Sequence, residues 1–191
     1  MKRILCALLS MLLLFPLSPA VLAVEEAAGE AEIKEKTIST ARQLAHFTRS
    51  CSRESYSRGV RFVLTTDIDL SESGVEIESA GYFVGEFDGG GHTIRGLAIT
   101  AAGSRLGLFR QIGPEGSVHD LSVEGSVLPA GTQGEIGGLA GFNEGTIRSC
   151  SFTGEVRGVQ DVGGVAGKNT GTVTSCQIGR ASCRERVCQY V

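Results

Sequence analysis

The stretch Gly137-Gly-Leu-Ala-Gly-Phe-Asn-Glu-Gly-Thr-Ile-Arg-Ser-Cys150 recurs as Gly163-Gly-Val-Ala-Gly-Lys-Asn-Thr-Gly-Thr-Val-Thr-Ser-Cys176, 26 residues later. Nine of the fourteen positions are identical, and the pairs Leu139/Val165 and Ile147/Val173 are conservative. A period of this size, with one short apolar strand and several glycines per copy, is typical of stacked repeat architectures. The repeat therefore decides the predicted fold.

Weaker copies precede these two. Gly116–Gly125 aligns when Gly116 is placed on Gly145, and Gly91–Ile99 is assigned the same register one step earlier, with Asp67–Leu70 as a degenerate turn. Short alternating apolar runs of this kind are typical of half-buried strands. The alignment predicts one column of anchors and one inward ladder, formed respectively by Ile94, Val118, Ile147 and Val173 and by Leu97, Leu121, Cys150 and Cys176.

The pattern predicts an all-β fold, a right-handed parallel β-helix or solenoid with a short N-terminal capping helix. Residues 39–49 supply that helix, with Ser39 or Thr40 as N-cap. Its apolar face consists of Ala41, Leu44, Ala45 and Phe47. Such a cover protects the first coil, whose backbone groups would otherwise lack partners. An irregular β-roll or a β-prism is the alternative, since the repeat determines stacking better than cross-section.

The repeated residues are assigned structural roles. The glycines are expected to adopt positive φ at corners and to leave room where coils approach closely. The asparagines are expected to hold a left-handed bend or to stack as an amide ladder, with sugar binding as a third role. The cysteines are expected to be core thiols or a bridge. The residues are Gly137, Gly138, Gly141, Asn143, Gly145, Cys150, Gly163, Gly164, Gly167, Asn169, Gly171 and Cys176.

The two ends of the chain are predicted to lie outside the fold. Residues 1–23 have the charged start, apolar run and small −3 and −1 residues of a cleaved signal peptide. Residues 24–38 form an acidic linker, and residues 39–177 form the capped solenoid. Residues 178–191 break the repeat pattern and are interpreted as an adapter-derived artefact, so that the natural protein is expected to continue past Gln177.

Charge and cysteine content exclude several classes of partner and site. Residues 24–177 carry a formal net charge of −7, which disfavours nucleic acid, because binding phosphates requires a basic face. That range holds only Cys51, Cys150 and Cys176, with no zinc-site spacing and too few thiols for a disulfide framework. The apolar run near the N-terminus is too short to span a membrane, so a secreted or cell-surface location without a membrane span is predicted.

Several residues resemble catalytic groups but fit structural roles better. Asp67 and Asp69 alternate on one strand, where carboxylates satisfy backbone donors at a corner. Asp88 and His92 enclose three glycines without the strand-to-helix context of a phosphate loop. No His-Glu-x-x-His zinc-peptidase motif is present. The prediction is a chain with no catalytic residue, no cofactor and no metal ligand.

The paired motifs 137–147 and 163–173 resemble the GLUG motif, with Ala140 and Ala166 where that pattern often has a bulkier apolar residue. The segments 42–47, 63–70 and 85–97 resemble the β-helical lead-in of large bacterial surface proteins. In that family the repeats also precede the catalytic region of IgA-cleaving metallopeptidases. The resemblance implies an extended, exported scaffold and no particular ligand.

The predicted function is a non-enzymatic surface or secreted scaffold used for adhesion, display or spacing. The alternative is the non-catalytic N-terminal region of a secreted hydrolase, either a metallopeptidase or a carbohydrate-active enzyme. An extracellular protein or glycan is the class of partner expected. Because the coil of Val173 would end in an uncovered edge, residues 24–177 are expected to be β-rich and to self-associate, which light scattering against concentration would measure.

Overall fold

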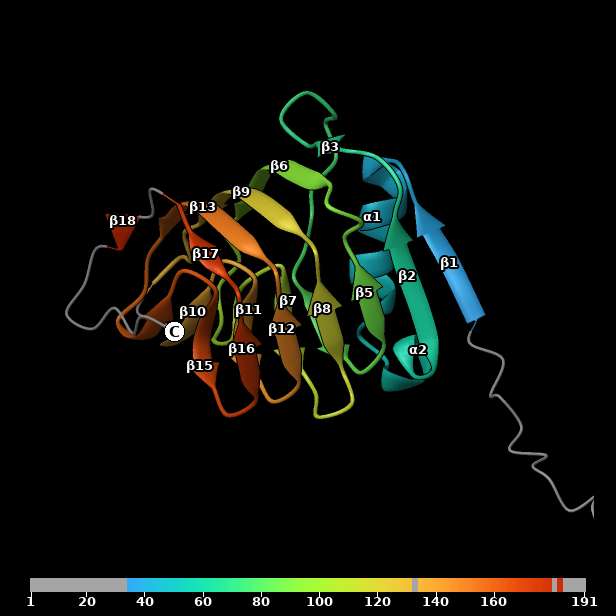
Figure 1. Ribbon diagram of the computed structural model, residues 1–191. Coiled ribbons are helices and arrows are strands. Elements are labelled where there is room, and N and C mark those ends of the chain that lie inside the picture. Colours follow the sequence, from blue (N-terminus) through green and yellow to red (C-terminus); the bar gives the residue numbers. More distant parts are fainter. Residues whose placement is uncertain (1–33, 132–133, 180–181, 184–191) are drawn as a thin grey trace, which may run out of the picture. The chain divides into compact units, whose positions relative to one another are not determined.

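The structure, a computed structural model, describes residues 34–131, 134–179 and 182–183. The chain winds through three walls of parallel strands, called here walls A, B and C, and each coil adds one strand to each wall (Figure 1). All strand pairs of the described residues are parallel, and equivalent residues of successive coils stand opposite one another. The predicted all-β solenoid is confirmed.

The walls are built from short strands. Wall A contains β1 Lys34–Ile38, β2 Val60–Leu64, β5 Glu86–Asp88, β8 Ser117–His119, β12 Thr146–Arg148 and β16 Thr172–Thr174. Wall B contains β3 Ile68–Asp69, β6 Thr93–Ile99, β9 Ser122–Val127, β13 Ser151–Val156 and β17 Gln177–Ile178, with β18 Ser182–Cys183 on β13. Wall C contains β4 Ala80–Phe83, β7 Phe109–Ile112, β11 Ala140–Asn143 and β15 Ala166–Asn169, and β10 Gly134–Gly137 pairs with β14 Gln160–Gly163 beside it.

Columns of apolar side chains form the core, because alternate residues of each strand point inward. The inward column of wall A consists of Phe62, Phe87, Val118, Ile147 and Val173. The expected alignment of Val118, Ile147 and Val173 is thus confirmed. The placement of Ile94 on Val118 is wrong, because Ile94 pairs with Val123 in wall B and Phe87 takes the position on Val118.

The two repeat copies keep the register that their sequences predict. Asn143 stands opposite Asn169, and Ile147 stands opposite Val173. In wall B, Leu121, Cys150 and Cys176 directly precede the paired residues Ser122, Ser151 and Gln177, as the predicted inward ladder requires. Leu97 does not belong to that ladder. It stands opposite Gly125 after an irregularity in the pairing of β6 with β9.

A helix covers the first coil. Helix α1, Ala41–Ser50, begins at Thr40, whose hydroxyl accepts a hydrogen bond from the Gln43 amide at 3.3 Å. Its inner face buries Leu44, Ala45 and Phe47, in agreement with the predicted capping face. The Phe47 ring packs among four others at centroid distances of 4.7 to 6.1 Å: Phe62, Phe87, Phe83 and Phe109. The second helix, α2, Glu54–Ser57, was not predicted.

The predicted boundaries need two corrections. Residues 34–38, assigned to the acidic linker, form β1, which pairs with β2 over its whole length because Ile38 is buried against the core. The fold also does not end at Gln177, since β17 reaches Ile178 and β18 pairs with β13. The predicted signal peptide lies outside the described residues, as do residues 24–33 of the linker. The artefact origin of residues 178–191 stays a prediction.

Candidate functional site

The glycines of the repeat lie where neighbouring backbones meet. A Cβ on Gly138 would overlap the Phe152 ring and the carbonyl oxygen of Gly164, and one on Gly145 would lie 2.5 Å from the Gly113 carbonyl oxygen. None of the eight glycines assigned to the repeat has a positive φ. Their expected role in close approach is therefore confirmed for these positions, and their expected role in left-handed corners is wrong.

Serines occupy the left-handed corners of the repeat instead. Ser149 and Ser175 have φ values of 50° and 53°, at the turn between walls A and B. Asp120 holds the same position one coil earlier, with a φ of 53°. Short polar residues adopt this conformation at a modest cost, because no packed neighbour has to move. Sequence reasoning placed the glycines at these corners because glycine is the usual left-handed residue.

Asn143 and Asn169 form an amide ladder. The Asn143 Nδ2 donates to Asn169 Oδ1 at 2.7 Å, and the Asn143 side chain is fully buried. Neither residue has a positive φ, so the alternative of a left-handed bend is wrong. Burial also removes Asn143 from any contact with a sugar. Its Oδ1 has no hydrogen-bond partner within the described residues, because Ile112 precedes it in the column.

The cysteines of the described residues 34–179 are free thiols. Cys150 is buried and Cys176 is half-buried on the next coil, where each Sγ lies 3.2 to 3.3 Å from the backbone carbonyl two residues before it. The interaction between the two thiols raises the pKa of Cys150, which burial also raises, and lowers the pKa of Cys176. Cys51 lies under the cap, where burial raises the pKa of its thiol to about 12. The expected core thiols are confirmed.

Asp67 and Asp69 act at a corner, as predicted. Asp67 Oδ1 accepts the Thr93 amide at 3.0 Å, and Asp69 Oδ1 accepts the Ser71 amide at 2.9 Å. The hydrogen bond from Thr93 holds the pKa of Asp67 below its ordinary value, and the bonds from Ser71 do the same for Asp69. These carboxylates satisfy backbone donors.

The outer face of wall A carries a polar cluster that sequence reasoning missed. His119 is 4% exposed, and its Nε2 lies 3.0 Å from Glu86 Oε1 while its Nδ1 lies 2.8 Å from Asp120 Oδ2. Asp88 Oδ1 lies 3.6 Å from the same Nδ1. The two ring nitrogens thus both face carboxylates. We call Glu86, Asp88, His119 and Asp120 the His119 cluster.

Three members of the His119 cluster offer ligand atoms that lie within 4.8 Å of one another: Asp88, His119 and Asp120. The two carboxylates already form ion pairs with arginines: Arg61 Nη2 lies 2.6 Å from Asp88 Oδ2, and Arg148 Nη1 lies 3.8 Å from Asp120 Oδ2. Burial alone would raise the pKa of Asp88, but the Gly90 amide and Arg61 outweigh it and lower that pKa. The arrangement forms an ion-pair ladder across four coils.

Asp88 and His92 do not come together as a site. Asp88 Oδ1 accepts the Gly90 amide at 2.8 Å, and His92 Nδ1 lies 3.2 Å from Asp67 Oδ1. The expectation that His92 belongs to a bend is confirmed. Asp88 contacts His119 instead, because the two residues stand opposite each other in wall A. The sequence would have revealed this pairing only if Phe87 had been aligned with Val118.

Comparison with known proteins agrees with the repeat. The family model of the GLUG motif matches residues 132–157. The chain carries a GLUG motif. The match includes one strand of each wall, β11, β12 and β13, and residues 163–176 of the next coil follow in register.

Two curated proteins resemble the chain over half its length or more. Halomucin of Haloquadratum walsbyi is 31% identical over 125 residues, which cover 58% of this chain and 1% of halomucin. A Gly-rich membrane protein of Evansella cellulosilytica is 34% identical over 109 residues, which cover 52% of this chain and 13% of that protein. The chain thus spans a small part of each relative. No solved structure matches it.

Both described helices are short. Helix α1 has 10 residues and α2 has four. A span needs about 20 predominantly apolar residues. No helix of the described residues is long and apolar enough to cross a membrane.

Proposed function

We propose that the chain is a non-enzymatic scaffold region of an exported, surface-associated repeat protein, used for adhesion, display or spacing. The GLUG motif and the similarity to halomucin and to a Gly-rich membrane protein support a surface location. The stacked coils support the scaffold role, because they extend in one direction by adding identical units.

The observation that carries the proposal is the pairing of outward polar side chains from coil to coil. Arg61 contacts carboxylates of the coils on both sides of it, at 3.9 Å from Glu35 in β1 and 2.6 Å from Asp88 in β5. On the opposite side, Glu135 lies 2.7 Å from Arg105 and 3.5 Å from Lys168. Both of these cations also lie 5.3 Å from the centroid of the Phe142 ring. Side chains that neutralise one another in this way support the walls and leave few groups free for chemistry.

Surface location can be tested with an antibody raised against the purified chain. Intact cells of the source organism should bind the antibody as strongly as permeabilised cells, and protease treatment of intact cells should remove the signal. Labelling that appears only after permeabilisation would overturn the proposed location.

The non-enzymatic role needs a separate test on the purified chain. Polysaccharide and peptide substrates should stay intact during long incubations. Hydrolysis that disappears in a His119→Gln, Asp120→Asn variant would assign catalysis to the His119 cluster and contradict the proposal. A zinc-peptidase motif in the downstream coding sequence would instead favour the N-terminal region of a secreted hydrolase.

A further inference from the structure

Charge is segregated along the solenoid. Residues 34–61, which form β1, the two helices and the first two residues of β2, carry a formal net charge of +5. Residues 62–179 carry −8. The acidic average of the whole chain therefore conceals a basic end, and the argument from net charge against anionic partners does not apply to that end.

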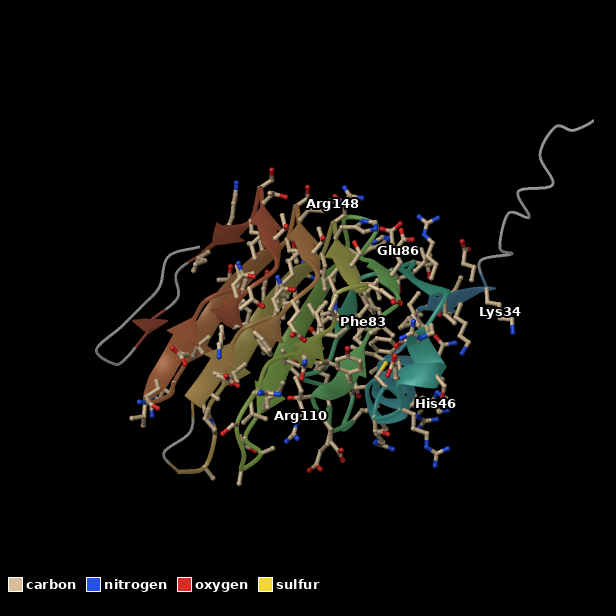
Figure 2. All side chains as sticks on the ribbon, turned by 90° about the horizontal axis from the view of Figure 1, so that it is seen from below. Lys34, His46, Phe83, Glu86, Arg110 and Arg148 are labelled. Atoms are coloured by element: carbon tan, nitrogen blue, oxygen red, sulfur yellow. The ribbon has the colours of Figure 1, made fainter. Side chains whose placement is uncertain are left out.

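The basic residues of the cap gather on the exposed face of α1. Arg42, His46 and Arg49 are separated by four and three residues, which places them on one helical stripe, and all three are exposed. Arg53 follows directly before α2 and is also exposed. Figure 2 shows His46 pointing away from the core, on the side of the cap opposite the solenoid interior. We call these four residues the cap patch.

The arginines of the cap patch have no acidic partner among the described residues. The ion pairs of residues 34–179 engage Arg58 with Glu54 and Glu115, and Arg61 with Asp88, but do not include Arg42, Arg49 or Arg53. Arginines elsewhere on the solenoid are mostly paired, as Arg95 is with Asp67 at 3.3 Å. An unpaired guanidinium keeps its five donors available for an external anion.

Two hollows meet at Arg49. The first, of about 500 Å³, is lined by Arg42, Ala45, His46, Arg49, Gly74, Val75 and Glu76. The second, of about 400 Å³, is lined by Arg49, Ser50, Ser52, Arg53, Ser55 and Tyr56. Glu76 is the acidic residue of these linings, and it forms no ion pair with the arginines. Arg49 thus lines both hollows, with a second guanidinium group in each, and the serine hydroxyls line the second hollow.

We propose that the cap patch binds an acidic polysaccharide, with the arginines on its anionic groups and the serines on its hydroxyls. Guanidinium groups match the geometry of carboxylate and related oxyanions. Since the proposal concerns what the basic end holds, it goes beyond the scaffold role and does not depend on it.

The surroundings of the patch favour a polysaccharide over other polyanions. Val159, the exposed large apolar residue of the described chain, lies in the repeat region and cannot insert the cap into a lipid surface. Tyr56 is half-buried, with the Lys36 ammonium 4.1 Å from its ring centroid. It therefore provides no free platform for stacking bases, which single-stranded nucleic acids require.

Binding of the purified chain to immobilised polygalacturonate and heparin, with neutral dextran as reference, tests the proposal. The variant Arg42→Gln, Arg49→Gln, Arg53→Gln should bind about tenfold more weakly, as the loss of three exposed charge contacts predicts. The control Arg95→Gln, Arg110→Gln, Arg157→Gln removes the same charge from the solenoid and should bind like the parent chain. Raising the salt concentration should weaken binding, because exposed charges are screened.

Several outcomes would overturn the proposal. Equal losses in the two triple variants would show that binding follows net charge and not the patch. If the chain bound neutral dextran as strongly as polygalacturonate or heparin, the anionic groups would have no role in binding. Tighter binding to single-stranded DNA or to anionic phospholipid vesicles would assign the patch to another partner. If circular dichroism shows that the cap variant is unfolded, Arg49→Gln alone, at the junction of the two hollows, should still weaken binding severalfold; unchanged binding would refute the patch.

Discussion

The N-terminal coils and the GLUG coils of this solenoid share the same backbone hydrogen-bond ladder but pack their cores differently. In the N-terminal coils, residues 34–112, large aromatic rings fill the space between walls, and Phe47 joins four other phenylalanines. In the GLUG coils, residues 134–179, Gly138 and Gly145 bring backbone onto backbone, with Ala140 inside. The same backbone hydrogen-bond ladder can therefore stack coils whose core is filled by large side chains and coils whose backbones are in direct contact.

The N-terminal coils and the GLUG coils also differ at the corners between walls A and B. The N-terminal corner uses Gly90 and Gly91, with φ values of 58° and 75°. The GLUG corners use Ser149 and Ser175 in the same left-handed region. Glycine is thus found both at the corner and at close backbone contacts in the N-terminal coils, where a Cβ on Gly85 or Gly89 would overlap a carbonyl oxygen, whereas the eight repeat glycines of the GLUG coils lie only at close contacts. Each region uses glycine where no other residue would fit.

The largest expected effect concerns the aromatic packing. Phe47→Ala should reduce the free energy of unfolding by about 3–5 kcal/mol, because it empties a ring site in the middle of the cluster. Phe152→Ala in the GLUG coils should cost less, since Phe152 has no ring partner in the described residues and stands opposite the aliphatic residues Val123 and Ile178. Urea unfolding followed by circular dichroism measures both. A larger cost for Phe152→Ala would contradict the distinction between the two regions.

A smaller effect is expected at the backbone contacts of the repeat. Gly145→Ala should cost about 1–3 kcal/mol, because its Cβ would overlap carbonyl oxygens that cannot move without displacing the preceding coil. Gly134→Ala is the matched control, since its Cβ would meet Gln160 at an ordinary 3.4 Å. Thermal unfolding of the two variants should differ by several degrees. Equal melting temperatures would show that close approach is not the reason for glycine in the repeat.

At the corner between walls A and B, one substitution is expected to increase the stability of the chain. Ser149→Gly should stabilise the chain by about 0.5 kcal/mol, because relief of the left-handed strain exceeds the entropy cost of glycine. Ser149 is exposed, so no packing is lost. The same unfolding measurement applies, with the half-buried Ser126→Gly, outside the left-handed region, expected to destabilise. A loss of stability in Ser149→Gly would mean that the serine side chain contributes to the corner.

The smallest effect is an acid dependence in the N-terminal coils. The pKa values of Asp67, Asp69 and Asp88 are lowered by folding, so their contribution is present above about pH 4 and is lost as pH falls through the folded-state values. The unfolding midpoint should therefore decrease below about pH 4, and Asp88→Asn should reduce that decrease. A decrease of the same size in Asp88→Asn would remove Asp88 from the explanation.

Sequence reasoning succeeded where the repeat is regular. Two nearly identical copies 26 residues apart align Asn143 on Asn169 and Ile147 on Val173 without knowledge of the fold. It went wrong at Ile94, because the segment from Asp88 to Thr93 is two residues longer than its partner from His119 to Ser122. The extra residues lie in a glycine bend, which absorbs them without changing the ladder on either side.

The sequence by itself determined the solenoid class, the capping helix and the order of the GLUG coils, because apolar alternation and a repeated motif are local properties. Only the tertiary structure decided which residues of different coils meet. Parallel stacking brought Asp88 and His119 together across 31 positions and made residues 34–38 a strand. In the GLUG coils it placed serine at the left-handed corners and glycine at the close backbone contacts. Such contacts depend on loop lengths between coils, which change the register without altering the pattern within any strand.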